Sequence, residues 1–173
     1  MLDMAAKVAD ARGDRDPRRD GPDIVIVTGM SGAGTTRLTI MSFGYKYGMP
    51  VDADLVADCR FLPNPHWVPD LRPFSGLDAP VRDYVLGQPP AAEFLDAYLS
   101  VLEISLAGFE KEGKRFVTVA VGCTGGKHRS VAMVEQLASR LSQGSSSEGV
   151  WGGRAPGRHG RNVTVTHRDL GRE

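Results

Sequence analysis

The sequence has only two cysteines, Cys59 and Cys123, no excess of either charge and no apolar run long enough to cross a membrane. Two cysteines cannot form the disulfide framework on which small secreted domains depend. The 21 Lys and Arg residues balance 21 Asp and Glu residues, which disfavours a polycationic nucleic-acid coat and a basic membrane-surface segment. The first ten residues carry acidic side chains where a signal peptide needs basic ones. We therefore expect a cytoplasmic protein without a membrane partner.

The 173 residues are enough for one domain with appendages. Residues 1–23 hold five basic and six acidic side chains with little aliphatic bulk, which predicts a disordered leader. Residues 143–161 are rich in glycine, serine and arginine, which predicts a flexible insertion. Most of the aliphatic residues lie between these two segments, so we expect the packed core there.

Short β-branched runs alternate with longer amphipathic segments along this part of the chain. Strands are predicted at residues 24–27, 38–43, 54–60, 116–121 and 163–166. Helices are predicted at residues 91–112 and 130–141, with a proline-rich loop at residues 61–73. Strands that alternate with helices indicate an α/β domain.

The glycine-rich segment GMSGAGTT after the first predicted strand has the spacing of a nucleotide phosphate loop, GxxxxGK[ST]. Its candidate nucleotide-binding residues are Gly29, Ser31, Gly32, Gly34 and Thr36. Thr35 stands where such a loop needs lysine, and the following residues predict a strand where the loop needs a helix N-terminus. We therefore expect weak or no nucleotide hydrolysis, and we assign neither a cofactor nor a metal site.

The segment GCTGGKHRS joins a predicted buried strand to a predicted helix. Gly125 and Gly126 let the backbone turn its N–H groups inward, and the helix N-terminus adds partial positive charge. Arg129 offers a planar fork for phosphate oxygens, and Lys127 and His128 are its neighbours in sequence. This combination predicts a site for phosphate or another small oxyanion.

A second polar cluster follows the third predicted strand, at the strand end where open α/β sheets bind their ligands. Asp58, Arg60, Asn64 and His66 would offer a carboxylate, a guanidinium, an amide and an imidazole to a polyhydroxylated or amino ligand. In the alternative interpretation, Asp58 and Arg60 only pair with each other in an ordered proline-rich loop. Arg168, after the last predicted strand, is expected to face an anion at the same rim.

Residues 123–130 also match CxxGxxRS, which is close to the phosphate loop of cysteine-dependent phosphatases. In those enzymes a thiolate attacks phosphorus while an arginine and backbone amides hold the phosphate oxygens. Cys123 and Arg129 are therefore the alternative catalytic residues, with Asp70 of the WVPD segment as a candidate general acid. A cysteine beside a strand end is also commonly a small buried residue, so both interpretations stay open.

Longer stretches resemble the RapZ/YvcJ family of bacterial P-loop nucleotide-binding proteins, some of which act as adaptors for ribonuclease E. They are SFGYKYGMPVDAD, RFLPNPHW, LRPFSGLD, GCTGGKHRSV and the closing VTHRDL. The resemblance implies that residues 38–170 form the family's C-terminal sensor domain, an α/β domain similar to a subdomain of phosphofructokinase. It implies further that residues 24–37 are the remnant of a P-loop nucleotide-binding domain.

The resemblance also implies a function, in which this domain senses an amino-sugar phosphate, glucosamine-6-phosphate, as a regulatory ligand. Binding of ATP or GTP, and contacts with RNA or a ribonuclease, belong to the same expectation, and we also expect a homo-oligomer. The candidate ligand site comprises Asp58, Arg60, Asn64, His66, Cys123, Thr124, Gly125, Gly126, His128 and Arg129. We expect a regulatory binding module rather than an enzyme, and the cysteine phosphatase is the alternative.

Overall fold

The computed structural model describes residues 36–143 and 162–172. Its strands are β1 (Arg37–Gly44), β2 (Leu55–Asp58), β3 (Phe116–Cys123) and β4 (Asn162–His167). Its helices are α1 (Ala79–Leu86), α2 (Pro89–Lys111) and α3 (Arg129–Gln143), with the one-turn 3-10 helices η1 (Tyr45–Tyr47) and η2 (Pro65–Trp67). The predicted strand at 24–27, the predicted leader and residues 144–161 of the predicted insertion lie outside the described residues.

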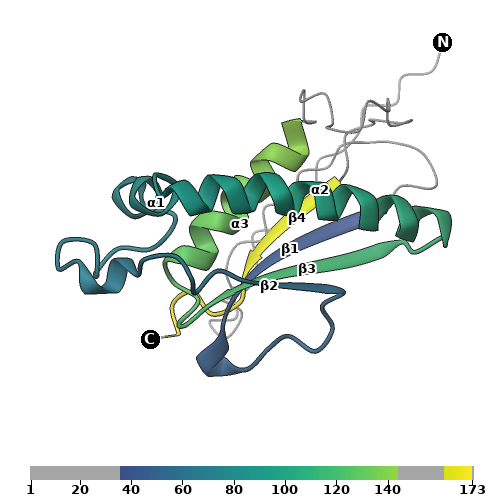
Figure 1. Ribbon diagram of the computed structural model, residues 1–173. Coiled ribbons are helices and arrows are strands. Elements are labelled where there is room, and N and C mark those ends of the chain that lie inside the picture. Colours follow the sequence, from purple (N-terminus) through teal and green to yellow (C-terminus); the bar gives the residue numbers. More distant parts are fainter. Residues whose placement is uncertain (1–35, 144–161, 173) are drawn as a thin grey trace, which may run out of the picture.

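The four strands form one parallel sheet in the order β2–β3–β1–β4 (Figure 1). β3 pairs with β1 along its whole length, from Phe116 opposite Arg37 to Cys123 opposite Gly44. Because the strands are parallel, their carboxyl ends share one edge of the sheet. The chain leaves β1 for β2 on one side and later adds β4 on the other, and this edge is where such sheets bind ligands.

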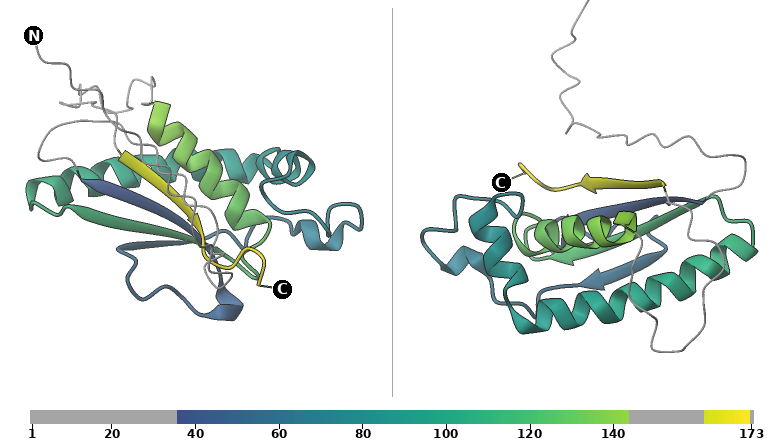
Figure 2. Two further views of the ribbon diagram at one scale, coloured as in Figure 1. Left: turned by 180° about the vertical axis from the view of Figure 1, so that it is seen from behind. Right: turned by 90° about the horizontal axis from the view of Figure 1, so that it is seen from above.

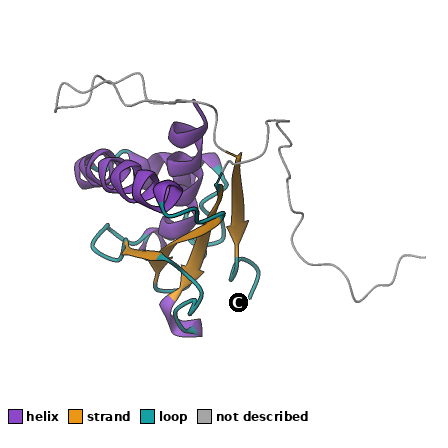
Figure 3. Cartoon of the chain, turned by 90° about the vertical axis from the view of Figure 1, so that its right-hand side faces the viewer, coloured by secondary structure: helices purple, strands orange, loops and turns teal. Residues whose placement is uncertain are grey.

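Buried and partly exposed side chains alternate along the central strands, so one face of the sheet is covered. Leu38 and Ile40 of β1 and Val119 of β3 are buried in the core, whereas Thr39 and Thr118 on the opposite face stay partly exposed. The helices lie against the first face (Figure 3), and α3 contacts β1, β3 and β4 (Figure 2). The β-branched and aliphatic runs therefore form strands for the expected reason, because alternate side chains leave water.

The helices complete the core with aliphatic side chains on one face. Leu95, Leu102 and Leu106 of α2 are buried, and burial of each such side chain contributes about 1.5–3 kcal/mol. α1 was not predicted from the sequence; it buries only Val81 and Val85 and is too short to show a clear periodicity. In the part of the chain that the structure describes, no helix is both long and apolar enough to cross a membrane.

Asp169 fixes the carboxyl end of β1. It is 1% exposed, and its Oδ2 accepts a hydrogen bond from the backbone N–H of Gly44 at 2.8 Å. Arg168 and Arg172 pair with the same carboxylate at 2.7 and 2.9 Å. Burial alone would raise the pKa of Asp169, but the hydrogen bonds from Arg168, Gly44 and Arg172 outweigh it and lower that pKa. The strand end that borders the candidate site is therefore held by a charged anchor.

A second polar chain links β1, β4 and α3. Ser42 Oγ lies 2.8 Å from Nδ1 of His167, and Nε2 of the same ring lies 3.0 Å from Glu135 Oε1. The order serine, histidine, carboxylate is that of a catalytic triad, but Ser42 is 0% exposed inside the sheet. The chain of contacts therefore fixes how β4 and α3 lie against β1.

Candidate functional site

A cavity of about 620 Å³ opens at the carboxyl edge of the sheet. Its walls come from the segments that follow β1, β2 and β3, together with the start of α3. The lining residues are Lys46, Asn64, His66, Trp67, Arg72, Cys123, Thr124, Gly125, Lys127, His128 and Arg129. Four of these are Lys or Arg and none is Asp or Glu, so the described lining is cationic and suits an anion.

The loop between β3 and α3 is shaped by glycine. Gly126 has φ +77°, in the left-handed region that residues with a Cβ rarely adopt. A Cβ at Gly126 would also lie 2.8 Å from the backbone nitrogen of Gly44 and 3.0 Å from Cβ of Asp169. The loop can therefore turn tightly against the end of β1 and deliver Arg129 to the first position of α3 only if residue 126 is glycine.

Hydrogen-bond donors of Gly126 and Ser130 surround the sulfur of Cys123. The hydroxyl of Ser130 lies 3.1 Å from Sγ, the backbone N–H of Gly126 donates to it at 3.2 Å, and the backbone N–H of Ser130 also donates to it. Cys123 is 3% exposed, yet it lines the cavity. The hydrogen bond from Cys59 and the Ser130 and Gly126 donors outweigh burial and lower the pKa of Cys123 to about 4.

Cys59, which follows β2, lies beside Cys123 and is fully buried. Its thiol is 3.1 Å from the backbone oxygen of Gly122, so its single S–H can donate either there or to the sulfur of Cys123. Donation to Cys123, followed by burial, raises the pKa of Cys59 well above its usual value. The two cysteines thus divide their roles, with Cys123 as thiolate and Cys59 as thiol donor.

We expect Cys123 to titrate near pH 4, far below the value of about 8.5 for an unperturbed thiol. The lowered pKa stabilises the fold above the unfolded-state value, and this contribution is lost as the pH falls through about 4. Ultraviolet absorbance of the thiolate, followed against pH, measures the transition. Cys123→Ser should remove it and Cys59→Ala should move it to higher pH. A wild-type midpoint at the unperturbed value would refute the assignment.

Arg129 is the most deeply buried cation of the cavity, with 4% of its surface exposed. Nη1 donates to the backbone oxygens of Arg60 and Leu62, both at 3.0 Å, and Nη2 donates to Thr124 Oγ1 at 3.2 Å. Its Nε–H is buried without a partner, and no carboxylate of the described residues forms an ion pair with the guanidinium. Burial of a cation without a close ion pair is costly, and an anion bound in the cavity stabilises it.

Two further cationic side chains approach the cavity from segments that are distant in sequence. The backbone N–H of Lys46 donates to Thr124 at 3.1 Å, which docks η1 onto the loop after β3. This places the Lys46 ammonium 3.8 Å from where a Cβ on Gly125 would lie. Arg72 donates to the backbone oxygen of His66, and its own backbone oxygen lies 3.3 Å from Nε2 of His128. The cationic lining is therefore assembled by the tertiary fold.

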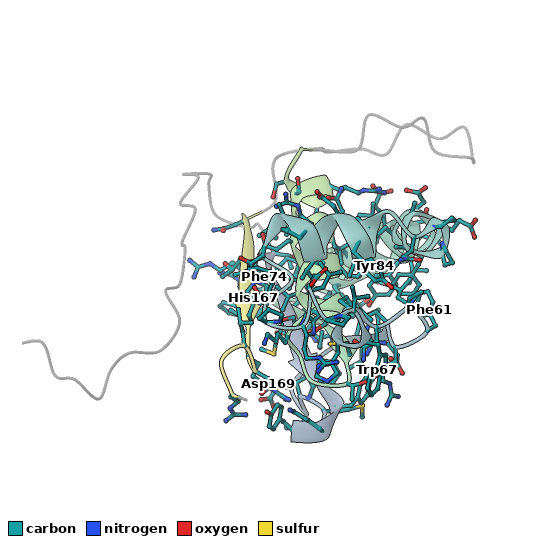
Figure 4. The ribbon with its side chains drawn as sticks, turned by 90° about the vertical axis from the view of Figure 1, so that its left-hand side faces the viewer. Phe61, Trp67, Phe74, Tyr84, His167 and Asp169 are labelled. Atoms are coloured by element: carbon teal, nitrogen blue, oxygen red, sulfur yellow. The ribbon has the colours of Figure 1, made fainter. Side chains whose placement is uncertain are left out.

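Another part of the lining is aromatic. Trp67 is 74% exposed, and its ring meets the ring of His66 edge-on with centroids 5.3 Å apart. Asn64 caps η2 by accepting a hydrogen bond from the backbone N–H of His66. Figure 4 shows Trp67 on the side of the molecule away from β4, whose end carries His167 and Asp169. An exposed indole at the mouth of a cavity offers a flat apolar surface to a ring-shaped ligand.

The structure brings most of the predicted site residues together. Asn64, His66, Cys123, Thr124, Gly125, His128 and Arg129 all line the cavity. Gly126 lies behind the loop, against β1 and Asp169. The lining also includes Lys46, Trp67, Arg72 and Lys127, which were not among the predicted ligand-binding residues. Of these, Lys127 belongs to the predicted anion loop, and Lys46, Trp67 and Arg72 lie in the stretches that carry the family resemblance.

Asp58 and Arg60 are placed outside the lining. Arg60 Nε and Nη2 reach both oxygens of Asp58, at 2.6–3.0 Å, and the guanidinium stacks over the ring of Tyr45 at 3.9 Å. The hydrogen bond from Arg60 lowers the pKa of Asp58. These two residues therefore follow the alternative stated from the sequence, in which they pair with each other.

Three other expectations concern residues away from this cavity. Arg168, expected at the same rim, instead pairs with Asp169 and donates to the backbone oxygen of Gly48. Thr36 lies before β1, at the opposite edge of the sheet, where its hydroxyl donates to Lys114 at 2.9 Å. Gly29, Ser31, Gly32 and Gly34 lie outside the described residues. Within residues 36–143 and 162–172, no three His, Cys, Asp or Glu side chains converge on a metal-binding position.

Comparison with known proteins gives a consistent picture. Residues 36–171 match the family described as the RapZ C-terminal domain. The chain is 51% identical over 177 residues to a nucleotide-binding protein of Frankia alni, covering 97% of this chain and 56% of that protein. It is 61% identical over 137 residues to a nucleotide-binding protein of Streptomyces coelicolor, covering 79% and 41% of the two chains. It is 60% identical over 137 residues to a nucleotide-binding protein of Thermobifida fusca, covering 79% of this chain and 42% of that protein. The chain thus spans about half the length of these relatives.

Proposed function

Because the chain belongs to the family of the RapZ C-terminal domain, we propose that its cavity binds a phosphorylated amino sugar as a regulatory ligand. The observation that carries the proposal is the buried guanidinium of Arg129, which lines the cavity and forms no ion pair with a carboxylate of the described residues. A phosphate bound in the cavity supplies negative charge and acceptor oxygens to this guanidinium.

The phosphate is proposed to bind at the start of α3. The helix N-terminus carries partial positive charge there, and the cationic residues Lys46, Lys127 and Arg129 line the cavity. Thr124 Oγ1 already contacts Arg129 and adds a hydroxyl to the wall. A phosphate monoester, with two negative charges near neutral pH, fits this charge distribution better than a neutral sugar does.

The sugar ring is proposed to lie toward η2. Trp67 offers its exposed indole face, and Asn64 and His66 offer an amide and an imidazole to hydroxyl or amino groups. The cavity of about 620 Å³ is within the range of small-molecule sites and exceeds what a bare phosphate needs. This division predicts that the phosphate contributes most of the affinity and that the ring contributes selectivity.

The test is calorimetric titration of the full chain with glucosamine-6-phosphate, glucose-6-phosphate, glucosamine and inorganic phosphate. Both sugar phosphates should bind, and glucosamine should bind at least about 30-fold more weakly, because loss of a desolvated charged contact costs about 2 kcal/mol or more. Equal binding of glucosamine and glucosamine-6-phosphate would overturn the proposal. A difference between the two sugar phosphates would measure the contribution of the amino group.

The wider roles that follow from the family remain further proposals. The relatives are named nucleotide-binding proteins, and the resemblance adds ATP or GTP binding, RNA contacts, a ribonuclease partner and a homo-oligomer. In this chain the nucleotide loop expected at residues 29–36 reaches the described part only at Thr36, whose hydroxyl is already bonded to Lys114. The sugar-phosphate proposal therefore rests on the cavity at the other edge of the sheet.

A further inference from the structure

The cavity contains a reactive group that ligand sensing does not require. Cys123 ends β3 and lines the cavity, Arg129 follows six residues later as the first residue of α3, and Ser130 comes next. We propose that Cys123 is a nucleophile that takes the phosphoryl group from a phosphate monoester bound here, which makes the chain a cysteine-dependent phosphatase. The inference rests on the proposed function in one respect, since the same cavity must bind phosphate.

The surroundings of Cys123 are those of a thiolate nucleophile. The hydroxyl of Ser130 is 3.1 Å from the sulfur, and the N–H groups of Gly126 and Ser130 also point at it. A structural cysteine in an apolar core has no use for this many donors, because a neutral thiol accepts hydrogen bonds weakly. Burial among donors keeps the sulfur charged and positioned, which is what attack on phosphorus needs.

The electrophile has a candidate position in the same cavity as the sulfur. Arg129 reaches the cavity from the start of α3, and its buried Nε–H still lacks an acceptor. A phosphate that pairs with this guanidinium lies in the same cavity as Cys123 and next to the positive end of the helix. The guanidinium is held from behind by the backbone oxygens of Arg60 and Leu62, so its geometry is set before a ligand arrives.

The proposed reaction has two balanced steps. In the first, the sulfur lone pair forms an S–P bond while the ester P–O bond breaks, and the leaving oxygen keeps the bonding pair and takes a proton. His66 lines the cavity and is the proposed proton donor, because Asp70 lies outside the lining. In the second step, water attacks phosphorus, the S–P bond breaks, the thiolate is regenerated, and a proton from water returns to His66. The sum is ester plus water giving alcohol plus inorganic phosphate.

Ser130 has a distinct positioning role in the second step. The departing sulfur carries the negative charge again, and the Ser130 hydroxyl stabilises that charge by donating to it. Removal of a hydrogen bond to a charged group costs about 1.5–3 kcal/mol, or roughly 10- to 100-fold in rate. Ser130→Ala should therefore slow breakdown of the phosphorylated cysteine and let this intermediate accumulate, which a purely structural serine would not do.

The experiment measures p-nitrophenol release from p-nitrophenyl phosphate by the full chain in the presence of a metal chelator, with calorimetric binding of inorganic phosphate to the same samples. We expect turnover by the wild type and a loss of at least about 1,000-fold in Cys123→Ser, with phosphate binding retained. Acid-quenched Ser130→Ala should carry a phosphoryl group on the peptide that contains Cys123. Ser100→Ala, a matched change at an exposed serine of α2, should behave as the wild type.

The outcomes separate this inference from the proposed function. Turnover that survives Cys123→Ser, or a wild type that binds phosphate without releasing p-nitrophenol, overturns the phosphatase while sugar-phosphate binding stands. Failure of the wild type to bind phosphate at all overturns both. Leaving-group dependence adds a further check, because His66→Asn should slow an alkyl phosphate more than p-nitrophenyl phosphate, whose leaving group needs no proton. Equal slowing of the two substrates would remove His66 from the mechanism.

Discussion

Arg129→Ala is expected to weaken the binding of a phosphate ester by about 30-fold or more, the largest loss at any single position of the cavity. The guanidinium is 4% exposed and forms no ion pair with a carboxylate of the described residues, so an anionic ligand in the cavity gains a close cationic partner. Removing one partner of a desolvated charged contact costs about 2–5 kcal/mol, which corresponds to about 30-fold to several thousand-fold in affinity. Calorimetric titration with glucosamine-6-phosphate measures the change.

Two further variants, one at Arg60 and one at Arg129, separate the effect of the Arg129 charge from the effects of side-chain shape and of folding. Arg60→Ala removes the same kind of side chain from an exposed site already paired with Asp58, and it should leave affinity within about twofold. Arg129→Lys keeps the charge but loses the fork that bonds Arg60, Leu62 and Thr124, and it should restore only part of the binding. If Arg60→Ala and Arg129→Ala weakened binding equally, the special role of Arg129 would be wrong.

Gly126→Ala is expected to lower the free energy of unfolding by about 2–5 kcal/mol. The left-handed backbone at φ +77° costs an alanine about 1–2 kcal/mol. The new Cβ would also lie 2.8 Å from the backbone nitrogen of Gly44, and relief of such overlap adds about 1–3 kcal/mol. Urea unfolding followed by circular dichroism measures the difference.

Gly113→Ala is the matched control for this prediction. Gly113 has nearly the same backbone, φ +74°, but no heavy atom lies within 4 Å of where its Cβ would be. Gly113→Ala should therefore lower the free energy of unfolding only by the conformational cost, about 1–2 kcal/mol. The excess of Gly126→Ala over Gly113→Ala isolates the steric contact with β1. Equal losses would mean that the loop can move away from Gly44 without cost.

The fold was largely predictable where local pattern and tertiary environment agree. The expected strands at residues 38–43, 116–121 and 163–166 correspond to β1, β3 and β4, because their alternating β-branched residues lie on a half-covered sheet. The expected strand at 54–60 is confined to Leu55–Asp58, since Cys59 and Arg60 already turn into the next loop. The long helix begins two residues earlier than expected because prolines are accommodated in its first turn.

The candidate site was predictable only where one segment supplies it. Residues 123–129 carry glycines, a cysteine and an arginine in a spacing that indicates an anion loop, and the structure places all of them except Gly126 in the lining of one cavity. Lys46 and Arg72 reach that cavity because η1 docks on Thr124 and because the chain after η2 returns to His128. No local sequence pattern encodes these two tertiary contacts. Asp58 and Arg60 show the opposite case. They lie two residues apart and pair with each other, outside the cavity.

The position of β3 between β1 and β2 has a consequence for the order in which the molecule can assemble. β1 and β2 do not pair with each other, so a nascent chain that stops before Phe116 has two strands and no ladder between them. Strand pairing with both begins only when β3 is made, and β3 ends at Cys123. Such non-local pairing folds slowly, because loop closure precedes the contacts that compensate for it. Cys123 is therefore the residue that completes the pairing of β1, β2 and β3, whereas the pairing of β4 with β1 waits until residues 162–167 are made.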